Sequence, residues 1–396
     1  MKETQNNKNT EANQLNEELG KEIEKIDFQS GAEFQGYEPK VEKPKKKKEK
    51  KKPKKTKKQI LKRVFIVLAI IILVPIVAFV TLRILGKSSL FSGKVNMKNG
   101  ANGAEVQNNG DLVIYKGHKY RYNENITSVL FMGVDRENIS SDEKTLKEHG
   151  AGQADTMFLA AYDSSSDKVS LISIPRDTMA DVKTYDEKGK YIGTKKTQLC
   201  LAYAYGDGRE KSCENTVDAV SKELYGIPID SYVSINLSAI SILNDAIGGV
   251  NVQVIGDLTD ADPDLKEGAN ITLLGDQAET YVRTREHEPL DANLERMKRQ
   301  QQYMTAFIQK TLRAVRDDIT LPLDLLNLVS DNTVTDISAS ELTYLGTEAL
   351  GVSFVSDDIH SIECKIEEGK TGYAEYYPDE TKLFELILDV FYTQAD

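Results

Sequence analysis

Cysteine and histidine are both scarce in this chain of 396 residues, which contains three cysteines and four histidines. Zinc centres are usually built from closely spaced Cys and His side chains. No such spacing links the histidines to the cysteines, and the motifs GxSxG, GxxxxGK[ST] and HExxH are missing as well. The sequence therefore argues against a zinc site, a serine-hydrolase elbow and a P-loop. The four histidines are His118, His149, His287 and His360.

The three cysteines permit more than one arrangement. A disulfide between Cys200 and Cys213 would close a loop of about a dozen residues and would stabilise the fold by about 3 kcal/mol on the loop-entropy model. Cys364 would then remain unpaired. An odd number of cysteines equally permits other pairings or none, so the sequence leaves these alternatives open.

Residues 64–82 (VFIVLAIIILVPIVAFVTL) form a long apolar run without a charge. This length is sufficient for a helix to cross a bilayer, and a single proline is tolerated there. The preceding residues 43–63 hold 14 lysines and arginines against one glutamate. The positive-inside rule therefore predicts a single-pass protein of the cell membrane, with a cytoplasmic N-terminus and an extracellular domain. A cleaved signal peptide fits less well, because the run begins more than 60 residues from the N-terminus.

Charge is distributed unevenly along the chain. The net charge is -11, of which residues 43–63 contribute about +13 and residues 83–396 about -19. An acidic extracellular body repels nucleic acid, and the N-terminal segment shows no helix-turn-helix pattern, so we expect no nucleic-acid partner. The lysine-rich run instead indicates a topology signal and a contact for anionic membrane lipid.

Composition divides the chain into four parts. Residues 1–63 are polar and lack periodic apolar positions, which predicts a disordered, lysine-rich cytoplasmic tail. The membrane run, residues 64–82, follows. Residues 83–122 mix Gly, Asn and Lys around a short strand-like piece and are predicted to form an extracellular stalk. Residues 123–396 contain no linker or charge run that would divide them, so we expect one large domain.

Within residues 123–396, short apolar runs alternate with segments of helical periodicity. This alternation predicts an α/β fold, a single domain of three-layer type with a central mixed β-sheet flanked by helices and preceded by one transmembrane helix. We expect strands at residues 126–134, 156–162, 169–174, 232–235 and 250–255, and helices at residues 214–225, 237–247, 275–282, 293–316, 339–349 and 379–392.

Residues 281–302 (YVRTREHEPLDANLERMKRQQQ) reverse the local charge, with four arginines, a lysine and three glutamines. Arg283 and Arg285 would project to one side of an extended segment. Arg296, Arg299 and Gln300 would fall on neighbouring positions of a helix. Guanidinium groups arranged in this way suit phosphate oxygens. The alternative is a solvated helix whose arginines pair with the nearby glutamates Glu286, Glu288 and Glu295.

Two aspartates and an arginine follow or begin predicted strands. The second and third strands are joined by DSSSDK, a hairpin-length loop, so they should be antiparallel. If the first strand also pairs antiparallel with the second, Asp135, Asp155 and Arg176 meet at one rim of the sheet. Carboxylates together with a phosphate are ligands that Mg²⁺ prefers. The alternative is that these are ordinary turn residues, and the long connection, residues 136–154, would also permit another pairing.

A succession of motifs now resembles a known family. The segments FMGVDRE, ADTMFLAAYD, VSLISIPRDT, LAYAYGDG, YGIPIDSYVSIN, DAIGGVNVQV, LLGDQAETYVRTRE and ERMKRQQQ, in this order, are similar to the LytR-CpsA-Psr family of Gram-positive envelope proteins. The resemblance spans about residues 125–310. It implies a Mg²⁺-dependent phosphotransferase that moves an anionic glycopolymer from a polyprenyl-pyrophosphate carrier to peptidoglycan, typically to a muramic acid hydroxyl.

The resemblance also implies roles for single residues. Asp135 and Asp155 match aspartates associated with Mg²⁺. The residues that match the surroundings of the pyrophosphate are Arg176, Arg283, Arg285, Arg296 and Gln300, and the residues implied in catalysis are Asp135, Asp155, Arg176 and Arg285. A general base for the acceptor hydroxyl is left open, since Asp155 could serve only if it is not committed to the metal.

Three positions depart from the family pattern. Gln153 stands where the family usually has arginine, and Gln198 and Cys200 stand where lysine and asparagine are common. Fewer cations at these positions predict weaker pyrophosphate binding or a different donor. Which glycopolymer and which acceptor position are used is not contained in the sequence.

The predicted helix that carries Arg296 also has an apolar stripe. Such a stripe forms part of the core in most proteins, but it could also flank a polyprenyl chain. The stripe consists of Leu294, Met297, Met304, Phe307 and Ile308.

Two other classes of function compete with the transferase. A hydrolase would use the same site to cut the pyrophosphate of a polyprenyl-linked glycan with water. A non-enzymatic envelope regulator is the other alternative, because proteins of this family were long labelled transcriptional attenuators, but the lysine-rich tail gives little support to direct DNA binding.

Overall fold

A six-stranded sheet forms the centre of the molecule. The computed structural model describes residues 57–136, 150–186, 189–284, 292–370 and 372–395, and of residues 57–72 and 292–294 it describes the backbone. In the described part of the chain the strand order is β12-β9-β4-β5-β6-β13. The strands are β4 Ile126–Val134, β5 Ala154–Asp163, β6 Lys168–Ile174, β9 Ser231–Asn236, β12 Thr333–Thr335 and β13 Ile359–Ser361.

The strand pairing makes the sheet mixed. β4 pairs antiparallel with β5, and β5 pairs antiparallel with β6, as the hairpin-length loop predicts. β9 lies parallel to β4, and the edge strand β13 lies parallel to β6. The predicted α/β fold with a central mixed sheet is therefore confirmed.

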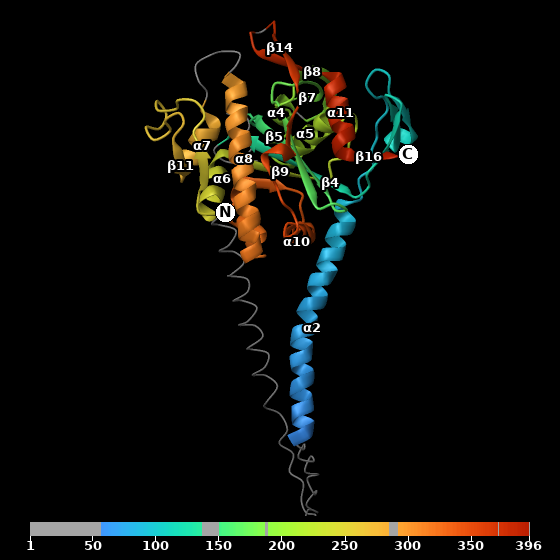
Figure 1. The fold of residues 1–396 in the computed structure, drawn as a ribbon, viewed down its shortest axis with the longest axis vertical. Coiled ribbons are helices and arrows are strands. Elements are labelled where there is room, and N and C mark those ends of the chain that lie inside the picture. Colours follow the sequence, from blue (N-terminus) through green and yellow to red (C-terminus); the bar gives the residue numbers. More distant parts are fainter. Residues whose placement is uncertain (1–56, 137–149, 187–188, 285–291, 371, 396) are drawn as a thin grey trace, which may run out of the picture. The chain divides into compact units, whose positions relative to one another are not determined.

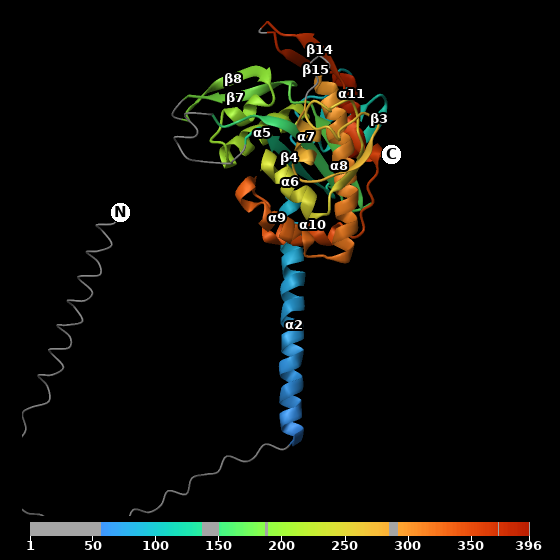
Figure 2. The ribbon, with the colours of Figure 1, turned by 90° about the vertical axis from the view of Figure 1, so that its left-hand side faces the viewer.

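Helices cover both faces of this sheet, which gives the predicted three layers (Figures 1 and 2). Side chains of β5 point alternately to the two faces, because successive strand residues do so. Met157, Leu159 and Ala161 pack in one cluster with residues of α5 (Glu210–Glu223) and α11 (Glu380–Phe391). Phe158 packs in another cluster with Met304 of α8 (Ala292–Asp317). The helices are α4 Leu201–Ala204, α5 Glu210–Glu223, α6 Leu237–Ala246, α7 Asp276–Arg283, α8 Ala292–Asp317, α9 Leu321–Leu328, α10 Ala339–Glu348 and α11 Glu380–Phe391.

Local signals explain where several helices begin and end. The Asn236 side chain accepts a hydrogen bond from the backbone of Ala239 and caps α6. Ser338 and Glu341 form a reciprocal capping box at the start of α10. After α6, Gly248 and Gly249 adopt positive φ angles of 78° and 75°, so they end the helix as predicted.

The predicted stalk, residues 83–122, is part of the folded body. It contributes three strands to a second sheet of order β1-β2-β3-β16, in which the last strand comes from the opposite end of the chain. Val95, Met97 and Val113 are buried in the same cluster as β4 and α11. The segment was predicted to be a stalk because it is rich in Gly and Asn, and this composition gave no sign that it packs in the core. The strands are β1 Glu105–Gln107, β2 Leu112–Tyr115, β3 His118–Tyr122 and β16 Tyr392–Ala395.

Three hairpins were not predicted as complete units, because their strands are short or largely polar. In each hairpin the two strands pair antiparallel. The β7–β8 hairpin leads from Asp177 to Gln198 and so frames the candidate site, and the loop after β10 leads to α7. The pairs are β7 Met179–Tyr185 with β8 Tyr191–Gln198, β10 Val250–Gln253 with β11 Asn270–Leu273, and β14 Cys364–Glu368 with β15 Ala374–Pro378.

The apolar N-terminal run lies in a single long helix, α2, which spans Lys57–Leu90 and includes Pro75. Its segment Leu73–Leu90 is long and apolar enough to cross a membrane. Residues 73–85 expose their side chains, whereas Leu90 is fully buried in the body. The helix therefore extends beyond the charge-free run, residues 64–82, at both ends.

Candidate functional site

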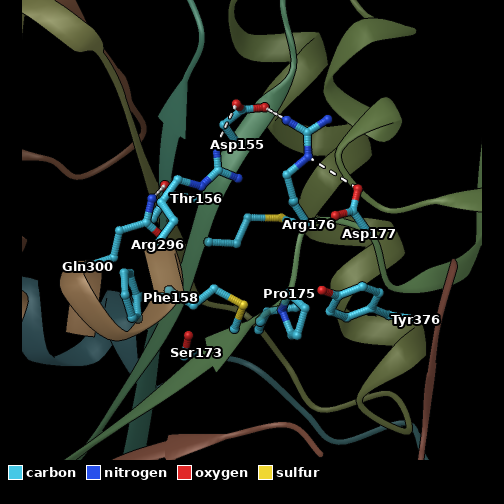
Figure 3. Close-up of a pocket in the computed structure, with 13 residues that line it drawn as sticks. Asp155, Thr156, Phe158, Ser173, Pro175, Arg176, Asp177, Arg296, Gln300 and Tyr376 are labelled. Carbon is cyan, nitrogen blue, oxygen red and sulfur yellow. Dashed lines mark hydrogen bonds and ion pairs between the residues drawn. The ribbon is translucent and has the colours of Figure 1, made fainter. Parts of the chain in front are cut away.

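Arg176 is the centre of the candidate site. It follows β6 and forms a short ion pair through Nη1 with Oδ1 of Asp155 at the start of β5. Its Nε lies 3.4 Å from Oδ1 of Asp177, and Figure 3 shows both carboxylates turned toward this guanidinium. Burial by itself lowers the pKa of Arg176, but the surrounding acidic groups raise it on balance. Arg176 therefore remains a cation that is held in place from two sides.

A β-bulge places Asp155. Along the β4–β5 ladder Gly133 faces Thr156 and Val134 faces Ala154, so the register skips Asp155. A bulged residue is left out of the ladder, and its side chain can be directed toward a site at the rim of the sheet. The predicted convergence of Asp155 and Arg176 at one rim is thus confirmed.

α8 brings two further polar side chains to this rim. Arg296 is 4% exposed, and its Nη1 lies 3.8 Å from Oδ2 of Asp155. Gln300, one turn later, donates from Nε2 to Oγ1 of Thr156 at 2.9 Å and to the backbone oxygen of Val282 at 3.1 Å. Figure 3 shows Arg296 reaching toward Asp155 from the side opposite to Arg176. Asp155 is therefore flanked by two guanidinium groups.

Arg299 has a different role from its helical neighbours. It is fully buried and donates from Nε to the backbone oxygen of Tyr281 at 3.1 Å. Its Nη2 makes a short hydrogen bond to the backbone oxygen of Thr284. The prediction that Arg299 faces an anion together with Arg296 is wrong, because Arg299 of α8 donates hydrogen bonds to backbone oxygens at the end of α7.

Asp135 and Arg283 form a second, more open pair. Nη2 of Arg283 lies 3.5 Å from Oδ1 of Asp135, and both side chains are more than half exposed. Arg283 is the last residue of α7 and also contacts Glu279, at 3.3 Å, so it is not part of an extended segment as predicted. Arg285, with Glu286 and Glu288, lies outside the described residues.

The three departures from the family pattern all contact the centre of the site. Nη2 of Arg176 donates to Oε1 of Gln153 at 2.7 Å and lies 3.4 Å from Sγ of Cys200. Nε2 of Gln198 donates to Oδ1 of Asp177 at 3.2 Å. Two neutral amides and a thiol therefore position Arg176 and Asp177 without adding a cation.

A small cavity lies between these residues and α8. The sequence placed Asp177, with Arg176, beside Asp155 at the end of the third strand, but it assigned Asp177 no role. Ser173 and Tyr376 were not predicted as members of the wall. Tyr376 comes from β15, and nothing local in the sequence predicts its place beside Asp177 and Thr178, which follow β6. The wall consists of Asp155, Thr156, Met157, Phe158, Ser173, Ile174, Pro175, Arg176, Asp177, Arg296, Met297, Gln300 and Tyr376 (Figure 3).

The carboxylates of the rim are a suitable donor set for Mg²⁺. Among the residues that the structure describes, no three His, Cys, Asp or Glu side chains come together as a complete metal cage. Mg²⁺ does not require one, because it keeps several waters and is commonly held by one or two carboxylates and the phosphates of a substrate. The backbone nitrogen of Asp135 bonds the oxygen of Gln153 at 3.1 Å, which sets Asp135 and Asp155 on adjacent strand ends. The two carboxylates therefore belong to the same rim of the sheet.

The apolar stripe of α8 is divided between different surroundings. Phe307 stacks on Tyr303 and packs with α6 and α7. Met304 and Ile308 pack against the sheet with Phe158. Met297 lines the small cavity, and the side chain of Leu294 lies outside the described residues. Much of the stripe is therefore core.

The chain matches the LytR_cpsA_psr family model over residues 89–388. The polyisoprenyl-teichoic acid–peptidoglycan teichoic acid transferase TagU of Enterococcus faecalis is 29% identical over 215 residues, which cover 54% of this chain and 63% of TagU. Biofilm regulatory protein A of Streptococcus mutans is 30% identical over 250 residues, 61% of this chain and 56% of that protein. The chain thus spans less than two thirds of the length of either relative.

Solved structures show the same fold. TagV of B. subtilis has a TM-score of 0.51 at 24% identity and covers 67% of this chain and 95% of TagV. A structure of TagT bound to LI-WTA has a TM-score of 0.50 at 23% identity and covers 67% of this chain and 89% of TagT. At this identity the likeness concerns the fold alone.

Proposed function

Because the chain belongs to the LytR_cpsA_psr family, we propose that it transfers a glycopolymer from a polyprenyl-pyrophosphate carrier to peptidoglycan, with formation of a phosphodiester link. The observation that carries the proposal is the convergence of Arg176, Arg296 and Asp155 at one rim of the sheet. Relatives such as TagU are named as transferases of teichoic acid from a polyisoprenyl carrier. The teichoic acid class of glycopolymer is therefore the one we favour.

The chain's own residues would bind and orient the diphosphate. Arg176 and Arg296 are largely buried and fixed, so their donors are ordered before a ligand arrives and need little reorganisation. Arg283 is exposed and can turn from Asp135 toward a phosphate oxygen. Arg285 is proposed as a further contact from the resemblance. A local group of cations is required because the extracellular part carries about -19 charges and repels anions elsewhere.

In the proposed reaction an acceptor hydroxyl oxygen attacks the phosphorus bound to the sugar. The bond from this phosphorus to the oxygen of polyprenyl phosphate breaks, and polyprenyl phosphate leaves. Asp135 and Asp155 would hold Mg²⁺, which neutralises charge on the diphosphate when bound. The proposal commits Asp155 to the metal, and its two oxygens also face the guanidinium groups of Arg176 and Arg296, so Asp155 is not assigned as the general base. The proton of the acceptor hydroxyl is assigned to no described residue.

The proposed site of action is the outer side of the cell membrane. α2 supplies a helix long enough to span the bilayer, and the lysine-rich residues before it favour a cytoplasmic N-terminus. The domain after Arg83 would then lie outside, where peptidoglycan is found.

A reconstituted transfer assay tests this function. Full-length protein in detergent is incubated with Mg²⁺, a synthetic polyprenyl-pyrophosphate oligosaccharide and peptidoglycan oligomers, and the coupled product is measured by mass spectrometry. We expect product that disappears with EDTA. Arg176→Gln should lower turnover by about 10²- to 10³-fold, a magnitude typical of removing one fixed donor to a developing charge.

The control is Arg313→Gln, which removes an exposed arginine from α8 away from the site and should leave turnover unchanged. Release of free sugar phosphate without coupling would establish the hydrolase instead. Equal turnover of wild type and Arg176→Gln would refute the assigned site. No reaction with any donor would favour a regulator, the class to which the name of the Streptococcus mutans relative points.

A further inference from the structure

The short helix α9 exposes apolar side chains to an unusual degree. Its sequence is LPLDLLNL, yet Leu325, at 9% exposed, is the one leucine of this helix that is buried. Leu323 is 46% exposed and Leu328 is 54% exposed. Ile319, just before the helix, is 46% exposed, and Leu350, just after α10, is 40% exposed. We name these four residues the α9 surface.

α10 connects α9 to the candidate membrane helix. A Cβ atom added to Gly86 of α2 would lie 2.1 Å from the backbone oxygen of Ser340 in α10, so the two helices are in direct backbone contact. A Cβ atom added to Gly346 of α10 would lie 3.5 Å from Pro322 of α9. α9 therefore packs on α10, and α10 packs on α2, as Figure 2 also shows.

Polar contacts of Arg83 mark the position along α2 at which α10 begins to pack against it. Arg83 is the first charged residue after the apolar run, residues 64–82. Its Nε donates to Oγ1 of Thr347 at 3.1 Å, and its Nη2 forms a short ion pair with Glu348, both at the end of α10. Arg83 and Lys87 also lie over the ring of Tyr344, at 5.7 and 5.9 Å from its centroid.

The apolar part of α2 ends at the same place. Its side chains from Leu73 to Leu85 are exposed in the protein, which suits a helix surrounded by lipid. Lysine and arginine at the end of such a helix mark the boundary between hydrocarbon and headgroups. The end of α10, and with it Leu350, therefore lies at the level of this boundary.

We propose that the α9 surface inserts into the headgroup region of the bilayer that α2 crosses. The inference rests on the membrane anchorage contained in the proposed function. The neighbouring charges Asp317, Asp318 and Asp324 are exposed and acidic, so apolar insertion and not attraction to anionic lipid drives the contact. The occupant is the acyl and headgroup boundary of a neutral bilayer.

Such a contact would hold the catalytic body at a fixed height. Near the start of α8, Arg296 lies at the site, and near its end Arg316 lies three residues before Ile319. These 20 residues span about 30 Å at 1.5 Å per residue. With α2 and α9 as two separate points of attachment, the body could neither tilt nor rotate freely about a single linker.

Tryptophan fluorescence provides a direct test, because the chain contains no tryptophan. Leu323→Trp and Leu328→Trp each place one indole in the α9 surface. The control is Ile192→Trp in β8, a position that is 64% exposed and belongs to a hairpin remote from α2 in Figures 1 and 2. Each full-length variant is reconstituted into phosphatidylcholine vesicles with plain or brominated acyl chains, and flotation with the vesicles is measured in the same samples.

We expect brominated lipid to remove about half of the emission of both α9 variants, since interfacial side chains reach about 5–10 Å into the acyl boundary. The control should lose none. Unchanged emission of both α9 variants, while the protein floats with the vesicles, would overturn the proposal. Failure to float would overturn it as well, by removing the anchor. Transfer activity is assayed separately, so quenching without transfer would count against the enzymatic function alone.

Discussion

Arg176 makes the closest contacts of the candidate site, and each of them constrains how it could bind an anion. Asp155 and Asp177 form ion pairs with it, and Gln153 accepts a hydrogen bond from it. Sγ of Cys200 lies 3.4 Å from its Nη2. A guanidinium held on several sides loses little entropy when a phosphate arrives. The neutral residues Gln153 and Gln198 stand where the resemblance implies arginine and lysine, so the site has fewer cations than the family pattern implies.

The three cysteines allow a prediction about the reactivity of their thiols. All three have free thiols, so the disulfide that the spacing permits between Cys200 and Cys213 is not formed. Burial raises the pKa of Cys200 to about 11 and the pKa values of Cys213 and Cys364 to about 12. Since the thiolate is the reactive form, a shift from 9.0 to about 11 should slow thiol modification by about 100-fold in the native protein.

The measurement is a thiol count with a colorimetric reagent at pH 8, without reductant. We expect almost no fast reaction in the native protein and three equivalents after unfolding. One equivalent after unfolding would contradict the free thiols. The folded state binds these protons more tightly, so their stabilising contribution is complete below about pH 9 and is lost as the pH rises toward 11 and above.

α8 combines binding and structural roles on different faces of one helix. Arg296 and Gln300 face the rim of the sheet, whereas Arg299 turns toward the end of α7. The i, i+3, i+4 spacing that predicts a common site is therefore misleading for Arg299. The physical reason is that the two backbone oxygens at the end of α7 need a buried donor, which Arg299 supplies.

Replacement of Arg299 tests this division. Arg299→Met should lower the free energy of unfolding by about 3 kcal/mol, because the oxygens of Tyr281 and Thr284 lose their donor. Urea unfolding followed by circular dichroism measures the change. The control is Arg313→Met, which alters an exposed residue of the same helix and should change stability by less than about 0.5 kcal/mol. Equal effects of the two variants would argue against the structural role.

Charge separates the chain into a basic segment before the candidate membrane helix and an acidic body after it. Residues 43–63 contribute about +13 and residues 83–396 about -19. This asymmetry favours one orientation in the membrane, since lysine and arginine are retained on the cytoplasmic side. It also makes the arginines of the rim a local exception within an acidic domain.

Protease accessibility tests the orientation. In spheroplasts that produce the chain with different tags at its two ends, added protease should remove the C-terminal tag and spare the N-terminal one. Both tags should be lost after permeabilisation with detergent. Loss of the N-terminal tag in intact spheroplasts would show the reverse orientation.

Sequence reasoning located most elements of the central domain, because they follow from local periodicity. The strand at residues 126–134 has the predicted bounds, and the predicted helix at residues 293–316 corresponds to α8, Ala292–Asp317. The three antiparallel strands that bring Asp155 to Arg176 followed from one loop length and a pairing assumption. In these regions the hydrophobic pattern of neighbouring residues agrees with the tertiary environment.

Other features depended on contacts between distant parts of the chain. The predicted stalk joins the body because β3 pairs with β16, at least 270 residues later in the chain, and no local sequence pattern indicates such a partner. The bulge at Asp155 and the place of Tyr376 arise from the register of neighbouring strands.

Periodicity and charge were thus sufficient for the candidate membrane helix and the α/β class, and a loop length with an assumed strand pairing was sufficient for the pair of Asp155 and Arg176 at the rim. The tertiary structure decided that Arg296 faces the rim of the sheet and that Arg299 bonds the backbone at the end of α7. The physical reason is that the burial and the direction of a side chain depend on what packs against it.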